Sequence, residues 1–169
     1  LMRSSAASDV YKRQVVECVV QGLPAGLGDP VFEKLDANLA KAILSIGAVK
    51  GFEIGDGMAA AQATGLANND SFVPCPNGTV TKATNHAGGV LGGISDGSPL
   101  IFRAAIKPTS SIAASQQTVN QSGEPITISV KGRHDPVIVP RAVVVVECMA
   151  ALVLADALLS AMTCRMEYV

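Results

Sequence analysis

Residues 140–162 place the strongest constraint on the fold of this chain. They contain no glycine and no proline after Pro140, and alanine, valine, leucine and methionine dominate, so a helix drawn through them is apolar nearly all round. The four valines at 143–146 would by themselves favour a strand. The composition that follows predicts instead one long buried helix starting near Pro140. A membrane span is excluded because it would place the charges of Glu147 and Asp156 inside the bilayer.

The composition describes a globular chain without a strong electrostatic field. Hydrophobic residues make up 49% of the 169 residues and charged residues 16%, which suits a well-buried core. A formal net charge of −1 provides no basic field to attract nucleic acid or an anionic membrane. Four scattered cysteines without a CxxC pair, and no apolar leader resembling a secretory signal, predict a cytoplasmic protein with reduced thiols.

The first half of the chain predicts one strand and one helix. Residues 1–14 show no periodicity, and we interpret them as a non-native leader. Residues 15–21 read as a buried strand. A helix should then begin with Asp29 as N-cap and Pro30 at the first helical position. Apolar residues spaced three and four apart predict a buried stripe on this helix: Phe32, Leu35, Leu39, Ala42, Ile43 and Ile46.

Strand patterns and turn formers alternate in the second half. A short strand and a glycine turn are expected over residues 49–57, and a further strand over residues 100–107. Residues 126–131 alternate apolar and polar side chains, which predicts a strand with one buried and one exposed face in an antiparallel sheet. Residues 67–84 are rich in Asn, Asp, Ser, Pro, Gly and Thr, and should be the least ordered internal segment.

Three segments carry residues suited to ligand binding. Residues 85–97 contain five glycines and could form a ligand cradle or a tight structural loop. Residues 107–111 place an ammonium and three hydroxyls around a proline, which suits a phosphate or polar ring edge as well as an exposed turn. Residues 133–136 combine Arg133 with Asp135 two residues on, as a shared pocket or a surface ion pair. The histidines and cysteines lack zinc-site spacing, and no HExxH or GxSxG occurs, so we expect no metal site and no serine-hydrolase triad.

Read in order, these segments resemble the chorismate synthase family over nearly everything after residue 21. No single glycine motif is specific to this family. The combination of segments in this order, ending in RHDP, PRA and Glu147, is specific. The stretches that carry it are residues 26–32, 48–57, 85–95, 107–111, 133–136 and 140–142 with Glu147. We therefore identify residues 15–169 as the carboxy-terminal part of a single chorismate synthase domain.

The resemblance implies an α+β fold, a β-α-β sandwich whose buried helices pack between antiparallel sheets, assembled as a homotetramer. It implies a lyase that converts 5-enolpyruvylshikimate 3-phosphate to chorismate and phosphate by 1,4-elimination with reduced FMN. It also associates the chain with NADP and with aromatic amino acid biosynthesis through the shikimate pathway. An inactive flavin- or phosphate-binding fragment, or a structural fragment of that enzyme, is the alternative.

The resemblance also assigns site residues. It implies a role for Asp135 in proton movement at the flavin, and contact of Arg133 with both substrate and flavin. At the first position of the flavin set the family often has asparagine, so Gly47 offers only backbone contacts. The full flavin-binding set is Gly47, Ala48, Gly92, Lys107, Pro108, Thr109, Ser110, Ser111 and Arg133.

The chain departs from the family in one large respect. The segments with SHG and GRSS-type motifs, which carry two catalytic histidines and most substrate-binding arginines, do not occur in it. Neither His86 nor His134 matches those histidines. We therefore expect the chain to be inactive by itself.

Overall fold

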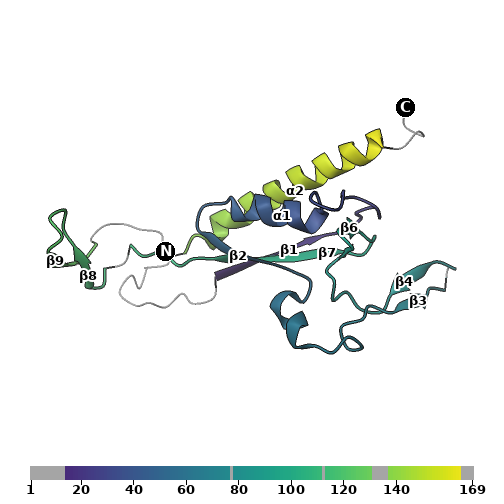
Figure 1. Ribbon diagram of the computed structural model, residues 1–169, viewed down its shortest axis with the longest axis horizontal. Helices are drawn as coiled ribbons and strands as arrows, with labels where there is room; N and C mark the ends of the chain where they lie inside the picture. The colour runs from purple at the N-terminus through teal and green to yellow at the C-terminus, as the bar shows by residue number, and fades with distance from the viewer. Residues whose placement is uncertain (1–13, 77, 112, 131–136, 165–169) are drawn as a thin grey trace.

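The computed structural model describes residues 14–76, 78–111, 113–130 and 137–164. Its centre is a three-stranded antiparallel sheet with β7 (Leu100–Ile106) between β1 (Gln14–Val20) and β2 (Val49–Ile54). Two helices, α1 (Leu35–Leu44) and α2 (Val139–Thr163), lie on one face of this sheet (Figure 1). The mixture of helices and antiparallel strands confirms the predicted α+β class.

The core lies between the sheet and the two helices. Side chains alternate along β7, so Phe102 and its even-numbered neighbours face the helices and are buried. Phe102 stacks on Phe52 of β2 with the ring centroids 5.4 Å apart. From α1, Leu39 and Ile43 are fully buried against this cluster, and each such side chain contributes about 1.5–3 kcal/mol of stability.

The expected start of the first helix is wrong. Asp29 does not cap a helix but forms an isolated β-bridge with Glu33, and α1 begins only at Leu35. The amide of Leu35 donates to the Gly93 carbonyl oxygen at 2.8 Å, so a distant loop satisfies one of the first helical N–H groups. Phe32, expected on the buried stripe, precedes the helix and is 89% exposed.

The long second helix is confirmed, but its predicted burial is wrong for the described residues. Only Ala142, Val146 and Ala150 of α2 are buried, one stripe at a spacing of four. Most of its other apolar side chains are exposed. By length and composition, α2 is also the one helix in the described part of the chain that could cross a membrane.

Fewer side chains of the strands are buried than we predicted. β1 is an edge strand covered on one face, so Val15 and Val19 are exposed although we predicted a buried strand. The expected strand over residues 126–131 appears as β9 (Pro125–Ile128), which pairs antiparallel with β8 (Gln116–Val119). No residue of β9 is buried, so the predicted buried face is wrong here.

Residues 67–84 are more structured than their composition suggested. They contain a hairpin of β3 (Phe72–Pro74) and β4 (Val80–Lys82), preceded by a 3-10 helix at Gly57–Gln62. The glycine-rich segment that follows forms a second hairpin, β5 (Val90–Leu91) with β6 (Ile94–Ser95). The β3–β4 and β8–β9 hairpins project at opposite ends of the central sheet (Figure 1).

Candidate functional site

The turn that joins α1 to β2 contains two residues of the predicted site, Gly47 and Ala48. Ala48 has a φ of +69°, a left-handed conformation that costs a residue with a Cβ about 1–2 kcal/mol. The turn is held by a hydrogen bond of 3.2 Å from the Val49 amide to the Ile46 carbonyl oxygen. Gly47 is exposed, with open space where a Cβ would stand. Backbone held in an unfavourable conformation beside open space is typical of a ligand-contacting turn.

The segment at residues 107–111 lies directly against this turn. The Lys107 amide donates to the Ala48 carbonyl oxygen at 2.8 Å, which extends the pairing of β7 with β2 by one residue. A β-bulge between Val49 and Gly51 shifts the register just before this contact. The sheet therefore brings together two segments that are about sixty residues apart in sequence.

The side chains of residues 107–111 provide the polar groups at this edge of the sheet. Lys107, Pro108 and Ser110 are exposed, while Thr109 and Ser111 are half-buried. The Ser110 carbonyl oxygen accepts a hydrogen bond of 3.0 Å from the Gln116 side chain, which ties the segment to β8. One ammonium and three hydroxyls beside an open backbone turn can bind a phosphate or the polar edge of a ring. We call residues 47, 48 and 107–111 the sheet-edge site.

Gly92 lies elsewhere in this chain. It sits in the β5–β6 turn with a φ of +64°, and its neighbour Gly93 accepts the hydrogen bond from Leu35 at the start of α1. Ala48 follows the end of α1, so the ten-residue helix, about 15 Å long, separates Gly92 from the sheet-edge site. The assignment of Gly92 and Lys107 to one cofactor therefore stays a prediction. Arg133 and Asp135 lie outside the described residues.

Sequence analysis missed an ion cluster in which Lys82 of β4 meets Asp70, before β3, and Asp96, after β6. The Lys82 ammonium pairs with the Asp96 carboxylate and lies 4.0 Å from that of Asp70, and all three side chains are at most 11% exposed. Asp70 also accepts hydrogen bonds from the Thr84 hydroxyl at 2.7 Å and from the amide of His86 at 2.8 Å. Lysine and aspartate are common in exposed turns, so their types and spacing could not predict this burial.

The electrostatics of the cluster follow from these contacts. Burial alone would raise the pKa of Asp70, but amide and hydroxyl donors together with the Lys82 charge outweigh it and lower that pKa below its ordinary value. The pKa of Asp96 is also lowered: burial acts to raise it, but the contacts with Lys82 and Ser98 outweigh burial. Both carboxylates are therefore ionised at neutral pH. Beside them, His86 Nδ1 lies 2.7 Å from a carboxylate oxygen of Asp56.

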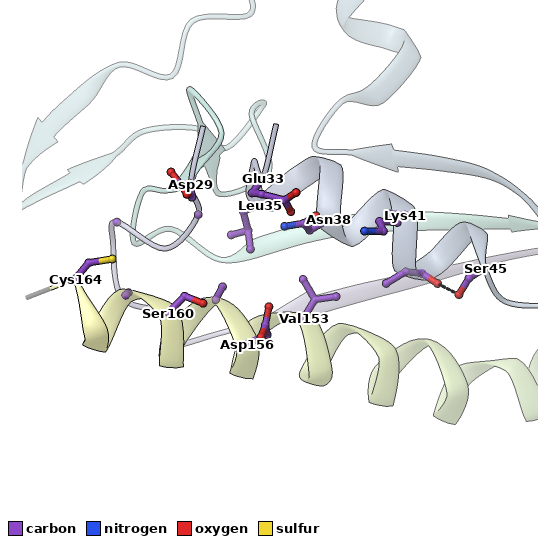
Figure 2. A pocket seen from close by; sticks show the side chains of 15 residues that line it. Asp29, Glu33, Leu35, Asn38, Lys41, Ser45, Val153, Asp156, Ser160 and Cys164 are labelled. Carbon is purple, nitrogen blue, oxygen red and sulfur yellow. Dashed lines mark hydrogen bonds between the residues drawn. The ribbon is translucent and has the colours of Figure 1, made fainter. Parts of the chain in front are cut away.

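A groove between α1 and the second half of α2 is a second candidate site. It has a volume of about 770 Å³, and the helices that form its walls run antiparallel (Figure 2). Asp29, Glu33 and Asp156 line it together with Lys41. Three carboxylates and one ammonium disfavour a phosphate-bearing ligand there. The groove contains no residue predicted for the site, and no group of His, Cys, Asp or Glu in the described part of the chain could hold a metal ion.

The fold defines a class of protein: an α+β domain with helices stacked on an antiparallel sheet and a polar segment at the sheet's edge. The model of the chorismate synthase family matches residues 13–159. The chain belongs to the chorismate synthase family.

Individual relatives agree with this assignment. A chorismate synthase from Agathobacter rectalis is 74% identical over 153 residues, which is 90% of this chain and 41% of the relative. One from Lachnoclostridium phytofermentans is 67% identical over 155 residues, covering 92% of this chain and 42% of the relative. A crystal structure of chorismate synthase superposes with a TM-score of 0.68 at 34% identity, over 89% of this chain and 37% of that chain. This chain thus spans about 40% of the length of the curated relatives it matches.

Proposed function

We propose that this chain is a part of a chorismate synthase and supplies one wall of that enzyme's active site. The enzyme is a carbon–oxygen lyase that eliminates phosphate from 5-enolpyruvylshikimate 3-phosphate and yields chorismate. The observation that carries the proposal is the hydrogen bond between Lys107 and Ala48, which joins two segments that the resemblance assigns to one cofactor. We further propose that the parent enzyme is a cytoplasmic homotetramer, as the family resemblance implies.

The sheet-edge site fits reduced FMN as its cofactor. The flavin carries a phosphate and a ring with polar edges, and the site offers the Lys107 ammonium, three neighbouring hydroxyls and an open backbone turn at Gly47. Lys107 would hold an anionic group, while Thr109 and Ser111, half-buried, would orient it. When bound, reduced FMN would supply electron density transiently and be recovered unchanged.

The remaining assigned residues act around this cofactor. Gly92 allows close backbone approach in the β5–β6 turn. Arg133 would clamp a charged group shared by substrate and cofactor, because a guanidinium binds phosphate or carboxylate with two parallel hydrogen bonds. Asp135 would move a proton beside the flavin, a role that Arg133 supports by keeping the carboxylate ionised.

An inactive flavin- or phosphate-binding fragment is the second candidate for the chain alone. It is favoured because this chain spans 41% of its A. rectalis relative, and because Lys107, Pro108 and Ser110 are exposed. General acid–base groups contribute about 10²–10⁴ each to rate, so losing those outside this chain should abolish turnover. An open site also loses the contribution of orientation.

The test measures chorismate by absorbance under anaerobic conditions with reduced FMN and the enolpyruvyl substrate. We expect no turnover by the chain alone, and turnover when the missing part of the A. rectalis relative is supplied. Flavin binding by the chain should weaken in Lys107→Gln, whereas Lys41→Gln, an exposed lysine on α1, should leave it unchanged. Turnover by the lone chain near that of an intact relative would show that the catalytic groups lie elsewhere.

A further inference from the structure

The glycine-rich segment at residues 85–97 is fixed at each end by a carboxylate. Near its amino end, Asp70 accepts a hydrogen bond of 2.8 Å from the His86 amide and another of 3.0 Å from the amide that follows. At its carboxy end, the carboxylate of Asp96 accepts a hydrogen bond of 2.8 Å from the Ser98 amide. The path of the backbone at both ends of the segment therefore depends on these two side chains.

Lys82 of β4 joins the two ends, because its ammonium lies between the two carboxylates. It pairs with Asp96 and lies 4.0 Å from a carboxylate oxygen of Asp70, and the three side chains are at most 11% exposed. Water and salt screen charges at this depth only weakly. Without the ammonium, two ionised carboxylates would face each other across the ends of one segment and repel. Lys82 thus holds the segment closed.

The β5–β6 turn lies between these two ends and is held from the side of α1. A Cβ at Gly93 would stand 2.6 Å from Cγ of Lys34, so the lysine stem packs directly on this glycine. Ser95 is 2% exposed, and its hydroxyl oxygen accepts a hydrogen bond of 2.9 Å from the Leu27 amide. Gly92, by contrast, is exposed and has open space where a Cβ would stand. A fixed frame therefore presents the Gly92 backbone to the outside.

Fixing this segment matters for affinity because five of its residues are glycines. Glycine loses more conformational freedom on ordering than any other residue. A ligand that had to order a free segment would lose affinity by that cost, whereas a segment ordered on folding binds without it. We propose that Lys82 is a positioning residue for the flavin, which holds residues 85–97 closed so that the Gly92 backbone is preorganised to contact it. This rests on the proposed function. Lys82 is nearly buried, so it acts through the segment and not on the ligand itself.

Hydrogen exchange of the chain alone tests whether Lys82 holds the segment. Lys82→Met should speed exchange of the amides at residues 86–97 about tenfold, because their local opening no longer breaks the ion pairs. Val146→Ala is the control, since Val146 is fully buried in the core on α2. It should speed exchange in β7, which follows global unfolding, and leave residues 86–97 unchanged.

FMN affinity tests whether the segment's position matters to the cofactor. The chain is co-expressed with the remainder of the A. rectalis relative, and FMN binding by the co-purified complex is followed by quenching of flavin fluorescence. The Kd for FMN should rise about tenfold in Lys82→Met. It should not change in Val146→Ala, nor in Lys50→Met, which removes an exposed lysine on β2. Circular dichroism identifies a temperature at which each variant is folded.

A milder variant serves if Lys82→Met does not fold. Asp96→Asn removes one ion pair but keeps a side-chain oxygen for the Ser98 amide, and Lys82 keeps Asp70. Exchange of residues 86–97 and the Kd for FMN should both rise, by less than in Lys82→Met. A purely structural role predicts lower stability in both variants with an unchanged Kd for FMN.

Several results would overturn the proposal. They are unchanged exchange of residues 86–97 in Lys82→Met, faster exchange with an unchanged Kd for FMN, and an equal rise in Kd in Val146→Ala. Weaker FMN binding in Lys82→Met, with a parent complex that forms no chorismate, would refute the proposed function alone. Turnover by the parent complex, with unchanged FMN affinity in Lys82→Met, would refute the role of Lys82 alone. A parent complex that does not form, or binds no FMN, would overturn both.

Discussion

Replacing Lys82 by methionine should destabilise the fold more than any other single change on the β3–β4 hairpin. Met keeps most of the apolar stem and removes the ammonium that pairs with Asp96 and Asp70. Both carboxylates would then be almost fully enclosed without a cation. Asp70 would keep its hydrogen bonds from Thr84 and the following amides, and Asp96 would keep its bond of 2.8 Å from the Ser98 amide.

The magnitude follows from these remaining contacts. Removing one partner of a buried ion pair costs about 3–5 kcal/mol, and the surviving donors place the expected loss at the lower end, about 3 kcal/mol. Lys50→Met, at an exposed lysine on β2, is the control and should change stability by less than about 0.5 kcal/mol. Adding Asp96→Asn to Lys82→Met should recover part of the loss, because it removes one unpaired charge.

The assay is urea unfolding followed by circular dichroism, repeated between pH 7 and pH 3. The folded-state pKa values of Asp70 and Asp96 are lowered, so their stabilising contribution is present above the unfolded value of about 3.9 and is lost as the pH falls through the folded values. Without Lys82 both pKa values should rise. The gap in stability between parent and variant should therefore be widest near neutral pH and narrow below about pH 4. Equal stability at pH 7 would refute the view that the cluster is buried and paired.

Two further substitutions test the packing. Gly88→Ala would place a Cβ 2.3 Å from the Gly55 amide nitrogen at a φ of +67°, and should cost more than about 2 kcal/mol, while Gly123→Ala, with a φ of +83° and open space, should lose only about 1 kcal/mol in the same urea measurement. Phe102→Ala should cost about 3–5 kcal/mol, because the ring is fully buried and stacked on Phe52. A loss under 1 kcal/mol for Phe102→Ala would mean that the sheet and helices are not packed as described.

The sequence predicted element types better than element boundaries or burial. Apolar periodicity found Leu35, Leu39 and Ile43 on one face because these residues do share a buried stripe. The helix start was misplaced because Asp29 and Pro30 have the residue types of a helix start. The real start uses Gly93, fifty-eight residues further on, as acceptor of the Leu35 amide. Local sequence cannot reveal a cap that tertiary structure supplies.

The predictions of buried side chains were wrong for a different reason. The apolar pattern of α2 and the alternation in β9 show which side chains can be covered, but not whether another element packs on them. In α2, Val144 and Leu159 are exposed, and in β9 Ile126 and Ile128 are partly exposed. Both errors have one physical origin. Periodicity is a property of the segment itself, whereas burial also depends on what packs against the segment. The contact between Ala48 and Lys107 depends likewise on the pairing of β2 with β7, which neither segment shows by itself.

The two ends of α1 divide the predicted cofactor residues into two groups. The register of β2 against β7 assembles Ala48 with Lys107, and that pairing is local to the central sheet. Gly92 depends instead on the contact between Gly93 and the amino-terminal end of α1. A single rigid ligand contacting both groups must span about the length of this helix, or meet Gly92 from a different copy of the chain. Loss of flavin binding on changing Lys107 is therefore a test of the sheet-edge site alone, and the assignment of Gly92 needs its own substitution.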